Sequence, residues 1–249
     1  MRPFPAGLRL LFILLLCAAC CASGCAPTHS LPQPHLVTEP AATPGAVRTA
    51  RWDIAALGYQ YLGQGLDYQS AGLAPVFLVF KNHSQEQPQV LVEEVRGLGR
   101  GEYLPYSIEE ACRLVYASNV FEVAAGDAAR NGAIGAAVGA GLGALIGLLT
   151  GGNDAIWQGA LIGGAIGGVG GAVTSIPEAK AQLREATRQE LYYYAWREEP
   201  LPPQYTRSGY IYLPGNVGIE RIRLTVRSAG KVETFEVPIA RPAPGAAQR

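Results

Sequence analysis

The chain has 249 residues with 20 basic and 20 acidic side chains, so its formal net charge is zero. No excess of positive charge is available to hold a phosphate backbone, which excludes nucleic acid as an expected partner. Charged residues make up only 16% of the chain and apolar residues 49%, whereas soluble domains typically carry about 25% charged residues. The composition fits neither a charged disordered tail nor an ordinary soluble enzyme.

The first 24 residues have the layout of an export signal. Arg2 and Arg9 flank a short basic region, and residues 10–16 form an apolar run too short to span a bilayer. Small residues then lead to Ala22-Ser23-Gly24-Cys25, which resembles a bacterial lipobox, the motif whose Cys is lipidated and becomes the first residue of the mature protein. We therefore expect a signal peptide over residues 1–24 and lipidation of Cys25. The alternative is an ordinary signal peptide cut near Ala22.

The resemblance to a lipobox also implies a location. Lipoproteins retained in the inner membrane tend to carry Asp after the lipidated Cys, and Ala26 stands here, so we expect an outer-membrane lipoprotein that faces the periplasm and binds membrane lipid through Cys25. Residues 25–50 are rich in proline without apolar periodicity, which predicts a flexible tether. Cys112 remains as a lone cysteine within a helical pattern, and we predict a buried, inert thiol there.

Short β-like runs stand on both sides of a helical region, and neither group has enough strands to bury two faces alone. We therefore predict an α+β fold in which an antiparallel Ig-like β-sandwich, made by residues 51–106 and 201–241, is interrupted by helices. Two separate small β domains are the alternative. The predicted strands cover residues 52–62, 76–80, 90–95, 209–213, 219–226 and 232–239, and the last two are expected to be joined by a turn at Ser228-Ala229-Gly230.

The inserted helical region is predicted over residues 107–200. Ser107-Ile108-Glu109-Glu110 is a capping box, and an apolar helical pattern follows it through Val115 and Val123. A polar helix is expected from Pro177 to Trp196, whose aromatic end would dock on the sandwich. Between these helices, residues 131–176 form two uncharged stretches of about transmembrane length around Asp154, which predicts a helical hairpin.

Glycine recurs every four residues in both stretches of this hairpin. Residues four apart share one helix face, so each helix would carry a groove in which a second backbone can approach closely. We expect the hairpin to insert in a membrane as a pair or oligomer, with a hairpin packed against protein as the alternative. The helix-packing glycines are Gly135, Gly139, Gly143, Gly147, Gly151, Gly159, Gly163, Gly167 and Gly171.

These glycines and the lipobox resemble the glycine-zipper segments of bacterial envelope lipoproteins, including the rickettsial surface-antigen family. The resemblance covers residues 132–173 and the lipobox. It implies a preference for envelope membranes and self-association through the zipper glycines. In that family the zipper lies near the anchor, whereas more than a hundred residues intervene here.

Catalytic and metal motifs are not recognisable in the sequence. The loose dinucleotide pattern at residues 139–144 lies inside the glycine array, without a preceding strand. His29, His35 and His83 have no second ligand at a suitable spacing. We expect a protein that is not an enzyme, without cofactor or metal, whose role in the cell envelope is structural or in assembly. A pore or translocation component and a periplasmic ligand-binding module are the alternatives.

Overall fold

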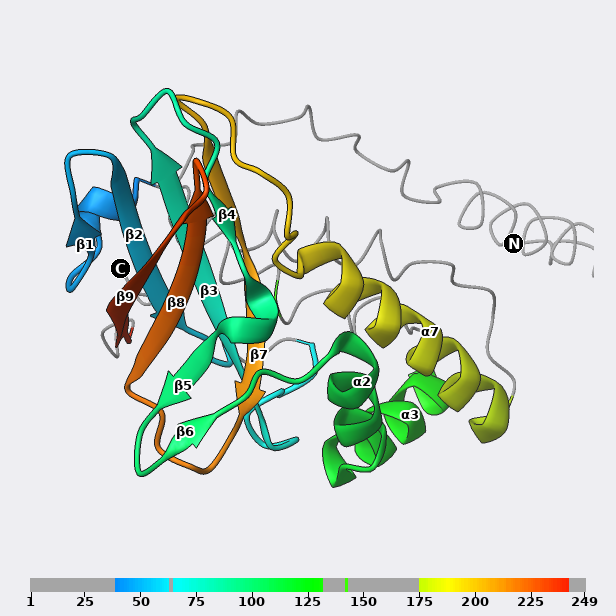
Figure 1. Cartoon of the computed structure of the whole chain (residues 1–249). Helices are drawn as coiled ribbons and strands as arrows, with labels where there is room; N and C mark the ends of the chain where they lie inside the picture. The colour runs from blue at the N-terminus through cyan, green and yellow to red at the C-terminus, as the bar shows by residue number, and fades with distance from the viewer. Residues whose placement is uncertain (1–38, 63–64, 132–141, 143–174, 242–249) are drawn as a thin grey trace, which may run out of the picture. The chain divides into compact units, whose positions relative to one another are not determined.

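The computed structural model describes residues 39–62, 65–131, 142 and 175–241. Within these ranges the chain forms a mixed nine-stranded sheet and three α-helices, which confirms the α+β class (Figure 1). The strands are β1 (Val47–Arg48), β2 (Trp52–Gly58), β3 (Leu73–Asn82), β4 (Gln89–Val90), β5 (Arg96–Leu98), β6 (Glu102–Tyr103), β7 (Thr206–Pro214), β8 (Arg221–Ser228) and β9 (Lys231–Ala240), and the helices are α2 (Ile108–Tyr116), α3 (Asn119–Asn131) and α7 (Ile176–Tyr194).

Strands from before and after the helical region share one sheet. Its order is β6-β5-β8-β9-β2-β3-β7, with β1 on β2 and β4 on β8. β3 pairs along its length with β7, although the two strands stand more than a hundred residues apart in the sequence. Strands that precede the helical region and strands that follow it therefore belong to one sheet.

The predicted Ig-like sandwich of two antiparallel sheets is not confirmed. The strands form one connected sheet that curls into a half-barrel, and the pair between β2 and β9 is parallel. That pair is restricted to Ala56 with Ile239 and Leu57 with Ala240, so the sheet turns at this junction. The turn lets side chains of β8 pack on those of β2 and β3, as the two layers of a sandwich would.

Two of the predicted elements are interrupted. The strand expected over residues 90–95 contains a 3₁₀ turn at Val92–Glu94, which separates β4 from β5. The helix expected to run from Ser107 through Val123 ends at Tyr116. A new helix starts after Ser118, whose hydroxyl oxygen accepts a hydrogen bond from the Phe121 N–H and so caps α3.

Other local predictions are confirmed. Ser107 and Glu110 form the complete capping box of α2. The polar helix expected from Pro177 to Trp196 is α7. β8 and β9 are joined as a hairpin in which Ala229 and Gly230 both have positive φ, as a tight primed turn requires.

Side chains of β2, β3 and β7 alternate between two buried cores. The sheet-side core lies inside the curl and contains Val76, Leu78 and Phe80 of β3 together with Leu224 of β8. The helix-side core lies between the same strands and the helices, and contains Phe77 and Val79 of β3. α7 packs on both α2 and α3 (Figure 1). These three strands are therefore a central layer, buried on both faces.

Candidate functional site

A buried carboxyl group marks the helix-side core. Glu190 on α7 is only 1% exposed. Its Oε2 accepts a hydrogen bond of 2.6 Å from the Tyr68 hydroxyl, and its Oε1 accepts one of 2.9 Å from the main-chain N–H of Leu142. Carboxylates are rarely buried so completely, and burial costs free energy unless hydrogen bonds compensate for it. Glu190 is therefore the first residue to consider as functional.

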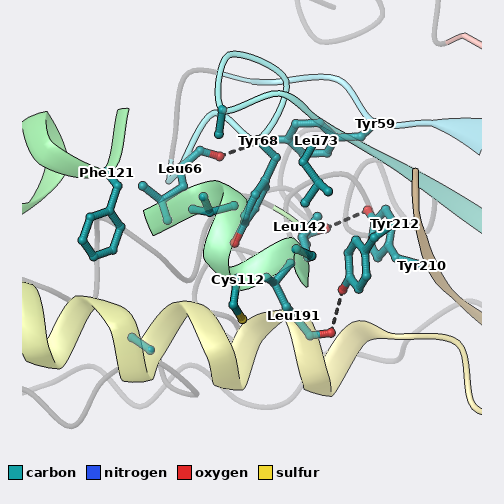
Figure 2. Close-up of a cluster of buried hydrophobic side chains, with 14 of the residues drawn as sticks. Tyr59, Leu66, Tyr68, Leu73, Cys112, Phe121, Leu142, Leu191, Tyr210 and Tyr212 are labelled. Carbon is teal, nitrogen blue, oxygen red and sulfur yellow. Dashed lines mark hydrogen bonds between the residues drawn. The ribbon is translucent and has the colours of Figure 1, made fainter. Parts of the chain in front are cut away.

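Four buried tyrosines lie in the same core as this carboxyl, and each hydroxyl donates a hydrogen bond. Figure 2 draws the hydrogen bonds of Tyr59, Tyr210 and Tyr212. Tyr210 donates to the carbonyl oxygen of Leu142 at 3.1 Å. Tyr212 donates to the carbonyl oxygen of Leu191 at 2.6 Å, and Tyr59 donates to that of Leu66 at 3.1 Å. The hydroxyl of Tyr68 is the partner of Glu190. We call Glu190, Tyr59, Tyr68, Tyr210 and Tyr212 the tyrosine–glutamate cluster.

Local sequence patterns bring these groups together. Tyr210 and Tyr212 are two apart on β7, so both face the helices, while Ile211 and Leu213 face the sheet-side core. On α7, the buried stripe of Ala179, Leu183 and Ala186 continues at helical spacing to Glu190.

Burial shifts the ionisation of the cluster. It raises the pKa of Glu190 to about 7, although the hydrogen bonds from Tyr68 and from the Leu142 N–H act in the opposite direction. It also raises the pKa of Tyr59, Tyr68, Tyr210 and Tyr212. The tyrosines thus stay neutral while Glu190 titrates near neutral pH.

Among the described residues, Leu142 is the member of the predicted zipper region that lies in this core. It lies between Gly141 and Gly143 in the sequence and is fully buried. In Figure 2 it lies near Leu73 and the two tyrosines of β7. The nine zipper glycines lie outside the described residues, as does Cys25. Between residues 131 and 175 of the predicted hairpin, the structure describes only Leu142.

The structure describes several other residues that were considered in the sequence. Cys112 is buried, as expected, and burial raises the pKa of its thiol. His83 contacts Asp53 at 2.8 Å. At the aromatic end of α7, Trp196 packs in the sheet-side core and Tyr194 against the helix-side core, while Tyr192 and Tyr193 are exposed. The expected docking of this end is therefore carried by Tyr194 and Trp196.

A pocket lies beside the end of β2, the start of β3 and the end of β7. This pocket has a volume of about 500 Å³ and combines apolar walls with polar side chains from Gln60, Gln69, Asn216 and Arg241. Among the described residues, its lining includes neither a carboxylate nor an imidazole or thiol. The pocket is lined by Gly58, Tyr59, Gln60, Gln69, Leu73, Ala74, Pro75, Val76, Leu213, Pro214, Gly215, Asn216, Gly218, Ile219, Ile239 and Arg241.

The tyrosine–glutamate cluster was missed at the level of sequence. Glu190 belongs to the helix predicted to be polar, yet its spacing from Ala179, Leu183 and Ala186 places it on the apolar face. A carboxylate at such a position indicates a buried polar contact. The partner of that contact was not predictable, because Tyr68 and Leu142 stand 122 and 48 residues away.

Comparison with known proteins identifies the glycine-rich region. Residues 111–176 match the model of the YMGG-like Gly-zipper family. The match runs from α2 to the first residue of α7 and covers about a quarter of the chain, and it confirms the predicted glycine-zipper segment. It supports a membrane-associated or structural role. Searches of curated proteins and of solved structures gave no match.

Two further findings concern only the part of the chain that the structure describes. None of the helices there has the length and apolar character needed to cross a membrane. Nor does this part contain a group of three or more His, Cys, Asp or Glu side chains that could hold a metal ion. Neither finding covers residues 132–141 and 143–174 of the glycine-zipper segment, which lie outside the described ranges.

Proposed function

We propose that this protein is an outer-membrane lipoprotein, anchored through Cys25 and facing the periplasm, with a non-enzymatic role in the structure or assembly of the cell envelope. Its glycine-zipper segment would associate with further copies of the chain or insert in the membrane. The observation that carries this proposal is the match of residues 111–176 to a glycine-zipper family. The lipobox at Ala22-Ser23-Gly24-Cys25 supports the anchor.

Metabolic labelling with palmitate tests the anchor. Label should enter the wild-type chain and be lost in Cys25→Ala, because the acyl chains are attached at that thiol. Cys112→Ala is the matched control and should keep the label, since Cys112 is buried in the fold. Label that persists in Cys25→Ala contradicts lipidation at this residue.

Crosslinking in membranes tests the zipper. Gly143→Ile and Gly163→Ile place a β-branched side chain in the middle of each glycine array, where it would push a facing backbone away. Both variants should form fewer crosslinked oligomers, although each raises the apolar content. Gly126→Ile is the control, because a side chain added at this glycine of α3 meets open space.

The outcomes separate the candidate roles. Unchanged or increased oligomers in both zipper variants would mean that the glycine spacing is not a packing surface. If the zipper variants form fewer oligomers and the wild-type protein shows concentration-dependent conductance in liposomes, a pore is favoured over a purely structural role. If the zipper variants form fewer oligomers and the wild-type protein shows no conductance, the structural role is supported.

A further inference from the structure

The main chain of Leu142 is bound from both sides by side chains of the folded domain. Its N–H donates to the Glu190 carboxylate at 2.9 Å, and its carbonyl oxygen accepts from the Tyr210 hydroxyl at 3.1 Å. Leu142, Glu190 and Tyr210 are each at most 1% exposed. Buried main-chain groups need partners, and here both partners come from residues distant in the sequence.

Three separate elements supply this arrangement. Glu190 comes from α7, Tyr210 from β7, and Tyr68 from the connection between β2 and β3. Tyr68 donates to the second oxygen of Glu190 and thereby leaves the first oxygen as the acceptor for Leu142. An acceptor and a donor are therefore held ready for the main-chain N–H and C=O of one residue, while its leucine side chain fills apolar space.

We propose that Glu190, Tyr68 and Tyr210 form a docking site for the chain's own glycine-zipper segment, which they bind at the main chain of Leu142 and thereby withhold from zipper association. The occupant follows from the contacts, because Leu142 belongs to the matched segment and lies directly before Gly143. The second half of the proposal rests on the proposed self-association of the zipper.

Docking and association exclude each other at this point of the chain. A residue that is fully buried in the helix-side core cannot also present its backbone to the glycine face of another helix or to lipid. Release of Leu142 would also leave the Glu190 carboxylate and the Tyr210 hydroxyl without partners in an apolar core, which is unfavourable. The cluster therefore favours the docked state.

Amide hydrogen exchange of the purified full-length lipoprotein in detergent micelles tests the docking. Tyr210→Phe removes one hydroxyl and keeps the ring, so exchange at the Leu142 amide should rise about fivefold, the usual effect of one lost hydrogen bond. Tyr212→Phe is the matched control on the same face of the same strand. Its hydroxyl is bonded to Leu191, so exchange at Leu142 should stay unchanged relative to that of the sheet amides.

A second variant tests the same contact in case Tyr210→Phe destabilises the whole fold. Glu190→Gln keeps the size of the side chain, but it has one acceptor oxygen and one NH₂ donor in place of the two oxygens that separately accept from Tyr68 and from the Leu142 N–H. It should also speed exchange at Leu142 relative to the amides of β3 and β8. If exchange at Leu142 stays unchanged in both variants, or rises only in step with those sheet amides, the docking site is wrong.

Crosslinking of the same variants tests the second half. Tyr210→Phe should raise the crosslinked fraction at least twofold over Tyr212→Phe, and adding Gly143→Ile should cancel the rise. Faster exchange at Leu142 without more oligomers overturns the withholding but leaves the docking supported. If Gly143→Ile has no effect in any background, the proposed zipper function fails while the exchange result still decides the docking.

Discussion

The two cores on either side of β2, β3 and β7 use different chemistry. Within the described residues, the sheet-side core is held mainly by aliphatic and aromatic packing. The rings of Trp52 and Phe80, for example, have their centroids 5.8 Å apart. The buried indole N–H groups of Trp52 and Trp196 have no hydrogen-bond partner there. In the helix-side core, by contrast, four tyrosine hydroxyls and a carboxylate are all bonded.

The difference indicates separate tasks. Apolar packing is not directional, so the sheet-side core can stabilise the curl without selecting a particular partner. A buried polar cluster is stable only when each member is satisfied, which restricts what can pack on it. The helix-side core therefore accommodates the main chain of one residue, Leu142, at defined polar positions, whereas the sheet-side core packs without such selection.

The largest expected effect comes from two phenylalanines of β3 that face opposite cores. Phe77→Ala and Phe80→Ala should each lower the free energy of unfolding in urea by about 3–5 kcal/mol, because both rings are buried. Phe77 packs on Tyr210 with ring centroids 5.0 Å apart. Only Phe77→Ala should therefore also speed hydrogen exchange at Leu142 beyond that of the sheet. Equal effects at Leu142 would contradict the division between the cores.

A pH-dependent stability should originate in the helix-side core. The pKa of Glu190 rises from its ordinary value of 4.5 to about 7 on folding, so between these values the folded state binds more protons than the unfolded state. The contribution of Glu190 to stability is thus complete below about pH 4.5 and is lost as the pH rises through about 7. The difference in unfolding free energy between wild type and Glu190→Gln should change by a few kcal/mol over this range.

Glu185→Gln is the control for that titration. Glu185 lies on α7 as well, but it is exposed and its pKa is lowered by hydrogen bonds from Arg188 and Gln189. Its removal should leave the fall in stability between pH 4.5 and 7 in place. A wild-type profile identical to that of Glu190→Gln would show that this carboxyl does not titrate in the folded protein as described.

The smallest effect concerns the thiol in the helix-side core. Cys112 is buried and its pKa is raised by burial, so iodoacetamide at pH 8 should not modify it in the folded chain. Modification should appear together with unfolding in urea, as measured by mass spectrometry. Rapid modification under native conditions would show that this core opens far more easily than its packing indicates.

Local patterns in the sequence were enough to predict much of the secondary structure. The capping box at Ser107, the helix ending near Tyr194 and the hairpin around Gly230 depend on neighbouring residues, and the structure contains all three. The break at Ser118 was missed because the apolar period continues across it. The glycine repeat likewise predicted the segment that the family match covers.

What the sequence determined by itself is therefore the longer strands, the polar helix α7, the α+β class and the glycine-zipper segment. The tertiary structure alone decided that the sheet curls as one piece, because that depends on the two-residue parallel contact between β2 and β9. It alone also decided the role of Glu190. A carboxylate in a helix pattern carries no record of its partners, and its burial and raised pKa arise only when distant Tyr68 and Leu142 close around it.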